Sequence, residues 1–279
     1  MAARILDGKA CAEEVLALIN NHLREKKPPV LVIYRIGDDP ASAVYVRNKV
    51  RAAEKVGIKV IVHHFPANEL CHNVIHGIEN EGKNPDIDGI MVQLPLPEGW
   101  DERVLIEHIP PEKDVDGLTY ANMGMLHEQT CWHKPCTAQG IIWLLHENGI
   151  HLTGRHVVVV GRSEIVGKPV ALLALNNNAT VSICHSRTKN LVEITRQADI
   201  LIVAVGKEKL ITADMVKPGA VVVDVGINRT AEGKLVGDVD FDAIKEVASW
   251  ITPVPGGVGP MTVAMLMMNT FHAQKSVTI

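Results

Sequence analysis

The fold of this chain is decided by residues 156–169, which read His-Val-Val-Val-Val-Gly-Arg-Ser-Glu-Ile-Val-Gly-Lys-Pro. The four consecutive valines, Val157–Val160, predict a strand that is buried on both faces of a parallel sheet. Gly161 then turns the chain, and the apolar stretch from Gly167 to about Leu175 predicts a helix. A strand that turns into a helix in this way directs backbone N–H groups and the positive end of the helix dipole at one point, which suits a phosphate group.

The glycines of this turn match the dinucleotide-binding fingerprint only in part. That fingerprint requires glycines at positions 161, 163 and 166. The chain has Gly161, Ser163 and Val166, with Gly167 one place late. From these residues alone, the segment is either a nucleotide-binding unit or a buried strand and helix that bind no ligand.

Length and composition narrow the class of protein. A chain of 279 residues favours two domains. The net charge of −4 provides no basic excess for a nucleic acid or a membrane surface. The sequence shows neither a signal-peptide core nor an apolar run near the roughly 20 residues of a membrane span. Its 5 cysteines, an odd number, indicate reduced thiols. We therefore expect a cytoplasmic protein.

One lysine lies on the apolar side of a helix predicted over residues 39–56. Asp39 and Pro40 match an N-cap followed by proline in the first turn. At about 100° per residue, Lys49 falls within the apolar arc, beside its i−4 neighbour Tyr45. In one interpretation its stem covers the core while its ammonium stays in water. In the other, a partly desolvated cleft lowers the pKa of the amine, which can then act as a general base or proton relay.

Two polar segments of the first half are also considered as parts of a ligand-binding site. A predicted strand, residues 87–92, is closed by Gln93-Leu94-Pro95-Leu96-Pro97. The prolines stop the ladder, so Gln93 stands at the carboxyl end of its strand, where ligands bind in open α/β sheets. Gln93 could equally cap the sheet edge. The second segment, Lys113-Asp114-Val115-Asp116-Gly117, is by itself an ordinary Asp-Gly turn.

A metal site is not expected. His127, Cys131, His133 and Cys136 lie within ten residues, but their spacing matches no paired ligand framework of the kind that binds zinc.

The choice of cofactor depends on the residues after the second strand of the nucleotide-type half, predicted over residues 180–184. An NAD site usually carries an acidic residue here, whereas an arginine accommodates the 2′-phosphate of NADP. Residues 185–190 contain no acid but include Arg187 and Lys189, and Arg162 stands in the first turn. If this half binds a dinucleotide, we expect NADP.

The C-terminal part is predicted to return to the first half. Three further strands are expected near residues 200–205, 220–225 and 250–251. Residues 252–260 then form a connector rich in proline and glycine, and Pro260 opens a last helix. We expect this helix to cross back to the first domain, with the connector in the cleft between the domains.

Taken together, five segments resemble one family, the bifunctional methylenetetrahydrofolate dehydrogenase/cyclohydrolase enzymes of the FolD type. The segments are Tyr45-Val46-Arg47-Asn48-Lys49, Val92-Gln93-Leu94-Pro95-Leu96-Pro97, Lys113-Asp114-Val115-Asp116-Gly117, residues 161–169 and residues 253–262. They occur in the family's order from about Asp7 to Asn269, so the resemblance covers nearly the whole chain.

The resemblance implies an α/β fold of two domains. An N-terminal folate-binding catalytic domain would comprise residues 1–136 plus 262–279, and a Rossmann-like NADP-binding domain residues 137–261. The C-terminal helix would return to the first domain. Family members are typically homodimers that pair through the nucleotide domain.

The resemblance also implies two reactions. NADP would oxidise 5,10-methylenetetrahydrofolate, and water would convert the resulting methenyl cation to 10-formyltetrahydrofolate. Lys49 would be the central catalytic residue, Tyr45 and Gln93 would orient it, and Asp116 would bind the pterin. The residues expected to line the NADP site are Gly161, Arg162, Ser163, Ser186, Arg187 and Ile227, and those expected to flank the folate are Pro255, Gly256 and Gly257.

Two alternatives and one departure accompany this interpretation. An NAD-dependent relative with dehydrogenase activity alone is the enzymatic alternative, and a catalytically silent nucleotide-binding sensor is the non-enzymatic one. A short-chain dehydrogenase is disfavoured, because the Tyr-x-x-x-Lys pair here precedes the nucleotide fold. The departure is Ala138-Gln139, where the family usually has proline and a basic residue, which puts the start of the local helix in doubt.

Overall fold

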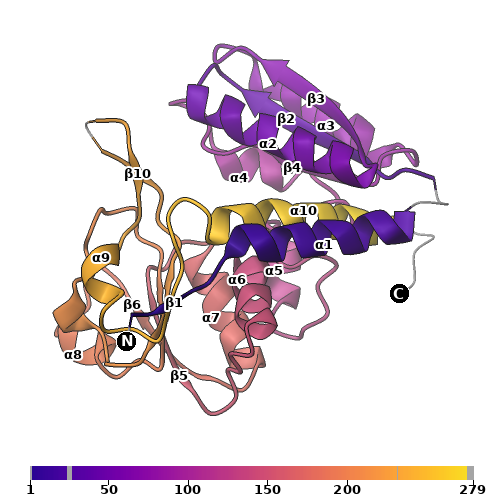
Figure 1. Cartoon of the computed structure of the whole chain (residues 1–279). Coiled ribbons are helices and arrows are strands. Elements are labelled where there is room, and N and C mark those ends of the chain that lie inside the picture. The colour runs from indigo at the N-terminus through magenta and orange to yellow at the C-terminus, as the bar shows by residue number, and fades with distance from the viewer. Residues whose placement is uncertain (1, 24–26, 231, 275–279) are drawn as a thin grey trace. The chain divides into compact units, whose positions relative to one another are not determined.

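The computed structural model describes residues 2–23, 27–230 and 232–274 (Figure 1). The chain divides into two compact units. Unit 1 comprises Met1–Ala12 and Thr137–Thr262, and unit 2 comprises Glu13–Cys136 and Val263–Ile279. Helix α1 (Gly8–Leu23) starts in unit 1 and ends in unit 2, as does the last helix, α10 (Val258–Ala273). In the described part of the chain, no helix has both the length and the apolar character to cross a membrane.

Within the described residues, unit 1 is built on a six-stranded parallel sheet in the order β1-β11-β8-β7-β5-β6. Its strands are β1 (Arg4–Ile5), β5 (His156–Val160), β6 (Thr180–Cys184), β7 (Ile200–Val203), β8 (Val221–Asp224) and β11 (Trp250–Ile251). The valines of β5 are at most 2% exposed, which confirms the predicted strand buried on both faces. The chain order reverses at β5, which lies between β6 and β7.

Short helices and a hairpin complete unit 1 (Figure 1). They are α6 (Cys136–Glu147), α7 (Gly167–Asn176), α8 (Leu191–Thr195), the 3-10 turn η1 (Ala213–Met215), the hairpin strands β9 (Asn228–Arg229) and β10 (Leu235–Val236), and α9 (Phe241–Ile244). Helix α6 begins at Cys136 in spite of Ala138-Gln139, so this departure from the family's usual residues leaves the helix start intact.

The N-terminal segment differs from the division suggested by the sequence, which grouped residues 1–136 together. Arg4 and Ile5 form β1 and pair with Trp250 and Ile251 of β11, in the sheet of unit 1. A two-residue strand is too short to carry an alternating apolar pattern, so this pairing leaves no local signal in the sequence.

Unit 2 contains a three-stranded parallel sheet in the order β3-β2-β4, among the residues that the structure describes. Its elements are β2 (Val30–Ile36), α2 (Pro40–Val56), β3 (Lys59–Phe65), α3 (Cys71–Lys83), β4 (Gly89–Val92), α4 (Glu102–Ile106) and α5 (Tyr120–Met125). Side chains of β2, β4 and α3, including Val32, Ile90 and Ile78, form a buried apolar cluster. This cluster fixes the central strands, whose carboxyl ends lead to the candidate site.

Helix α2 begins and ends at the predicted residues. The Asp39 carboxylate accepts a hydrogen bond of 2.7 Å from the Ser42 amide, and Pro40 occupies the first turn. Gly57 ends the helix with a φ of 79°, a conformation that glycine adopts without a steric penalty. Because both ends are fixed, the rotation of α2 about its axis, and so the direction of each side chain, is well defined.

A buried carboxylate in unit 1 gives a testable pH dependence. Asp224, at the end of β8, is 2% exposed. Burial raises the pKa of this carboxyl from 3.8 to about 6, with a smaller contribution from the nearby Asp238 and opposition from backbone N–H groups. A carboxyl with a raised folded-state pKa binds protons more tightly in the folded state, so it contributes most to stability at low pH. Its contribution should fall by roughly 3 kcal/mol as the pH rises from about 4 to about 7.

Urea unfolding of the wild type and of Asp224→Asn across this pH range measures the effect. As the pH rises, the unfolding free energy of the wild type should fall relative to that of Asp224→Asn. A difference that stays constant from pH 4 to pH 7 would contradict the assignment.

Candidate functional site

The side chain of Lys49 points into unit 2. It is only 9% exposed. Its Nζ donates a hydrogen bond of 2.9 Å to Gln93 Oε1 and lies 3.4 Å from Met91 Sδ. The interpretation in which the ammonium stays in water is therefore wrong, and the desolvated amine that the helix pattern allowed is the one observed.

The sheet of unit 2 explains why these residues meet. Helix α2 connects β2 to β3, and β4 pairs with the other side of β2. The backbone of Gln93 extends this pairing beyond β4, since its N–H donates to Tyr34 O at 2.8 Å. The Gln93 Nε2 donates to Leu94 O at 2.5 Å. The amide nitrogen is thus engaged with the backbone, which turns the amide oxygen toward the lysine.

Asp116 lies in a turn that is held from within. The buried Asp114 carboxylate accepts hydrogen bonds from the Gly117 amide at 3.0 Å and the Thr119 amide at 2.7 Å. Gly117 has a φ of 73°, and a Cβ there would lie 2.6 Å from the Lys134 carbonyl carbon. The Asp-Gly turn expected from the sequence is present, and it holds the half-buried Asp116 close enough to Lys49 for their charges to interact.

Burial controls the protonation of the site. It lowers the pKa of Lys49, and the negative charge of Asp116 opposes this effect. Burial likewise raises the pKa of Asp116, with Lys49 opposing. A Cys136 thiolate would also raise the pKa of Lys49, but burial holds the pKa of that thiol well above its ordinary value. Cys136 is therefore a neutral thiol at neutral pH, and the Lys49 amine releases its proton more readily than an ordinary lysine.

Three residues of this neighbourhood were not identified as parts of the lysine site from the sequence. Met91 contacts the amine from β4. The Cys136 thiol donates to Val115 O at 3.2 Å, and Asn269 Nδ2, from α10, donates to the same oxygen at 2.9 Å. These contacts join residues more than twenty positions apart, so no local spacing reveals them. In the sequence, Cys136 was considered only as one of four His and Cys residues whose spacing matches no metal-binding framework.

Tyr45 lies one turn before Lys49 on α2 and is 37% exposed. Tyr45 is therefore partly accessible to solvent, one helical turn from the buried Lys49.

The nucleotide-type turn of unit 1 lies where the strand order reverses. The Gly161 amide donates to Cys184 O at the end of β6, and the Ala204 amide donates to Val160 O at the end of β5, both at 2.8 Å. The carboxyl ends of β6, β5 and β7 are therefore adjacent. Ligands of open α/β sheets bind at such a reversal point.

The turn itself has the close backbone approach that a dinucleotide site needs. Gly161 has a φ of 124°, and a Cβ there would lie 2.2 Å from Ala204 O. A Cβ at Gly167 would lie 2.4 Å from Gly161 O. The Ser163 hydroxyl accepts hydrogen bonds from the Val166 and Gly167 amides at 3.2 and 3.3 Å. Because a hydroxyl keeps its own hydrogen when it accepts, Ser163 can still donate to a phosphate oxygen. These residues fit a dinucleotide phosphate.

The other predicted cofactor residues follow neighbouring strands. Arg162, Ser186, Arg187 and Ile227 are all exposed. They follow β5, β6 and β8, so they lie at the same edge of the sheet as Gly161.

The predicted folate-flanking segment, Pro255-Gly256-Gly257, has a structural role within unit 1. The Lys9 amide donates to Gly256 O at 3.1 Å. A Cβ at Gly8 would lie 1.7 Å from Gly257 O, so the backbones of these two glycines pass in very close contact. A Cβ at Gly257 itself would lie 2.7 Å from Pro253 O, and Gly256 has a φ of 110°, so the local backbone requires glycine at both positions.

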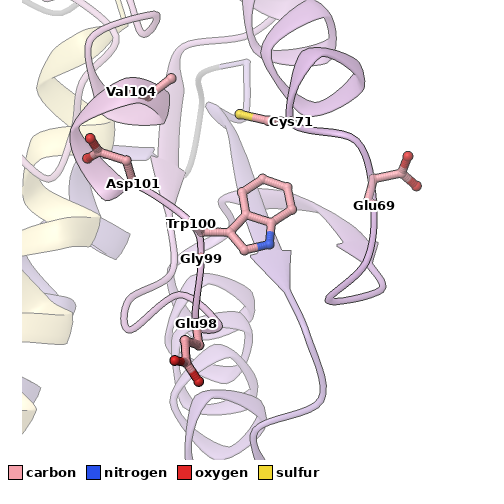
Figure 2. Close-up of a pocket in the computed structure, with 7 residues that line it drawn as sticks. All are labelled: Glu69, Cys71, Glu98, Gly99, Trp100, Asp101 and Val104. Carbon is pink, nitrogen blue, oxygen red and sulfur yellow. The ribbon is translucent and has the colours of Figure 1, made fainter.

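A separate pocket of about 330 Å³ lies in unit 2 around Trp100 (Figure 2). It is lined by Glu69, Cys71, Glu98, Gly99, Trp100, Asp101 and Val104. None of the predicted site residues lines this pocket. Among the described residues, no group of three or more His, Cys, Asp or Glu side chains could hold a metal ion.

Comparison with known proteins agrees with this geometry. The family model "Tetrahydrofolate dehydrogenase/cyclohydrolase, catalytic domain" matches residues 6–116. The model of the NAD(P)-binding domain of the same family matches residues 135–278. The bifunctional protein FolD of Moorella thermoacetica is 53% identical over 279 residues, which cover 99% of this chain and 100% of the relative.

Solved structures of similar proteins extend over the same length. The bifunctional FolD dehydrogenase/cyclohydrolase of Campylobacter jejuni has a TM-score of 0.95 at 44% identity, with 99% of each chain covered. The FolD enzyme of Trypanosoma brucei, solved with NADP cofactor and an inhibitor, has a TM-score of 0.93 at 36% identity, with 99% of this chain and 98% of that chain covered.

The fold, the buried amine and the nucleotide-type turn define a two-domain enzyme that uses a nicotinamide dinucleotide. The chain belongs to the tetrahydrofolate dehydrogenase/cyclohydrolase family. It is accordingly a bifunctional enzyme of folate one-carbon metabolism, and the predicted family, fold class and enzyme class are confirmed.

Proposed function

We propose that Lys49 is the catalytic amine of this enzyme, which oxidises 5,10-methylenetetrahydrofolate with NADP and hydrolyses the methenyl product to 10-formyltetrahydrofolate. The observation that carries the proposal is the buried Lys49 amine, which donates a hydrogen bond of 2.9 Å to the neutral side-chain amide of Gln93. An ammonium beside the cationic methenyl carbon would be repelled. A neutral amine avoids that repulsion and can accept a proton.

The hydrolysis then follows from the protonation of one side chain. Water forms a C–O bond to the methenyl carbon while Lys49 Nζ takes one of its protons. The Lys49 ammonium returns this proton to N5 of the folate as the C–N5 bond breaks. The remaining hydroxyl proton is released to solvent as the C=O bond forms, which leaves the formyl group on N10. Gln93 holds the amine without adding a charge, and Tyr45 and Asp116 orient the folate, the carboxylate by accepting hydrogen bonds from the pterin.

Unit 1 would hold the cofactor. When bound, NADP supplies the oxidising nicotinamide for the methylene carbon. Gly161 lets the backbone approach the phosphates, while Ser163 and Ser186 donate to phosphate oxygens. Arg162 and Arg187 would bind the 2′-phosphate. Ile227 supplies an apolar surface, and Pro255, Gly256 and Gly257 would flank the folate.

A spectrophotometric assay of the purified protein tests the proposal. Methylenetetrahydrofolate with NADP should give NADPH, and methenyltetrahydrofolate alone should be hydrolysed. Stronger activity with NAD and no hydrolysis would instead identify a dehydrogenase-only enzyme, and no turnover with either cofactor would leave a nucleotide-binding sensor.

Asp116→Asn should weaken folate binding by tenfold or more, because hydrogen bonds to a charged group contribute about 1.5–3 kcal/mol. NADP affinity, measured by titration, should be unchanged. Because the Asp116 charge raises the pKa of Lys49, its removal should also shift the rise of hydrolysis with pH toward lower pH. Unaltered folate affinity would contradict the role of Asp116.

We further propose that the protein is a cytoplasmic homodimer that pairs through unit 1. Strand β6 ends the sheet order of this unit, and Ile183 on it is 45% exposed. An edge strand with an exposed apolar residue is suited to pairing with a second copy. Sedimentation velocity should give twice the chain mass, whereas a monomer at micromolar concentration would contradict the proposal.

A further inference from the structure

A buried carboxylate in unit 1 supports an exposed loop from beneath. Asp238 is 0% exposed. One of its oxygens accepts hydrogen bonds from the Val205 and Gly206 amides at 2.7 and 3.0 Å, and the other accepts from the Lys207 amide at 2.8 Å. Residues 205–207 are themselves exposed. Three consecutive N–H groups of a surface loop thus converge on one buried side chain.

The same carboxylate also fixes the loop after β8. Asn228 Nδ2 donates to Asp238 Oδ1 at 2.9 Å. Asn228 follows Ile227 directly, so the position of one residue constrains the other. A single carboxylate therefore ties the loop after β7 to the loop after β8.

The position of Asp238 is fixed in turn by Asp224. The Asp238 and Val239 amides donate to the Asp224 carboxylate at 2.9 and 3.1 Å. Both carboxylates are tightly packed against the backbone. A Cβ at Gly226 would lie 2.1 Å from Asp238 Cγ, and one at Gly237 would lie 1.7 Å from Asp224 Oδ2. Each carboxylate is thus packed against a glycine.

Both loops leave the sheet at the carboxyl ends of neighbouring strands. The Val225 amide donates to Val203 O at 2.9 Å, which places the end of β8 beside that of β7. Val205 and Ile227, one in each loop, are 37% and 46% exposed. Two accessible apolar side chains at the ligand-binding edge of the sheet suit the flat ring of a nicotinamide or an adenine.

We propose that Asp238 is a positioning residue of the dinucleotide site: it holds the loops that carry Val205 and Ile227 in the conformation that the cofactor meets. This proposal rests on the proposed function of unit 1. A carboxylate suits the task because it accepts from four donors at once without offering a hydrogen of its own. In Asp238→Asn, the side-chain NH2 would face backbone N–H groups and could not accept hydrogen bonds from them. The loop on that side of the residue would then no longer be held in place.

The test compares cofactor binding with an activity that does not use the cofactor. In Asp238→Asn, the NADP dissociation constant, measured by titration, and the NADP KM should rise tenfold or more. Hydrolysis of methenyltetrahydrofolate, assayed without NADP, should stay within twofold of the wild type. The melting temperature is recorded for each protein.

Asp199→Asn is the matched control. Asp199 accepts from the His156 amide at 2.9 Å and from Lys217 Nζ at 2.7 Å, so it also ties segments of unit 1 together. It stands at the amino ends of β5 and β7, away from the edge at which Gly161 lies. This variant should lower the melting temperature and leave the NADP dissociation constant unchanged.

A lower melting temperature in Asp238→Asn with unchanged NADP binding would overturn the proposal, as would an equal loss of hydrolysis. If Asp238→Asn does not fold, Asn228→Ala removes one of the four hydrogen bonds at a half-buried residue. It should raise the NADP dissociation constant about threefold, and an unchanged value would likewise overturn the proposal. Wild-type protein that fails to bind NADP at all would instead refute the proposed function.

Discussion

Lys49→Met is expected to lower the rate of methenyltetrahydrofolate hydrolysis by roughly 10²–10⁴-fold, the usual contribution of a general acid or base. The substitution removes the proton acceptor but retains an unbranched apolar stem beside Met91, so the fold should persist. Oxidation of methylenetetrahydrofolate should retain part of its rate, because that step depends mainly on the alignment of folate and cofactor. The two activities, assayed separately on one protein preparation, give the measurement.

Two further variants serve as controls. One tests whether a positive charge alone is sufficient, and the other tests the loss of a different lysine from the same helix. Lys49→Arg keeps a positive charge but cannot lose its proton, so it should be as defective in hydrolysis as Lys49→Met. Lys55→Met removes an exposed lysine of the same helix, which is paired with Glu13 at 2.7 Å, and should stay within twofold of the wild type. Unchanged hydrolysis in Lys49→Met would refute the catalytic role.

The double variant Arg162→Ala, Arg187→Ala should raise the NADP KM about 100-fold and the NAD KM less than threefold. Two guanidinium groups that bind one phosphate contribute about 1.5–3 kcal/mol each, and NAD lacks that phosphate. The comparison of the two cofactors in the dehydrogenase assay isolates the 2′-phosphate from the rest of the dinucleotide.

Arg155→Ala is the control for this pair. Arg155 is an exposed arginine of the same unit, but it precedes β5 instead of following it. Its removal should leave both KM values unchanged. Equal increases for NADP and NAD in the double variant would remove the argument for NADP.

Elements with a strong local pattern could be predicted well from the sequence. The valine run of β5 and the capping residues of α2 encode burial and helix ends in consecutive positions, and both are present as expected. The apolar arc of α2 was compatible with both interpretations of Lys49 and did not favour the desolvated one that the structure shows. Burial depends on what packs over the arc, and a helix sequence does not contain that information.

The parts that could not be predicted depend on contacts between distant residues. Met91 reaches the lysine site from β4 and Cys136 from the start of α6, and the residues next to them in the sequence do not indicate this. The pairing of β1 with β11 joins the two ends of the chain through two residues. Likewise, the support of residues 205–207 by Asp238 spans about thirty positions and becomes visible only when the hydrogen bonds of the loop are traced.

The central claim concerns the protonation of one amine, and NMR titration of protein labelled with ¹³C at the lysine Cε measures it directly. One lysine resonance should titrate below the ordinary lysine pKa of 10.5, because burial lowers the pKa of Lys49, and that resonance should be missing from the spectrum of Lys49→Met. If every lysine of the wild type titrates near 10.5 and the resonance lost in Lys49→Met is one of them, the amine is charged at neutral pH and the proposed hydrolysis mechanism is wrong.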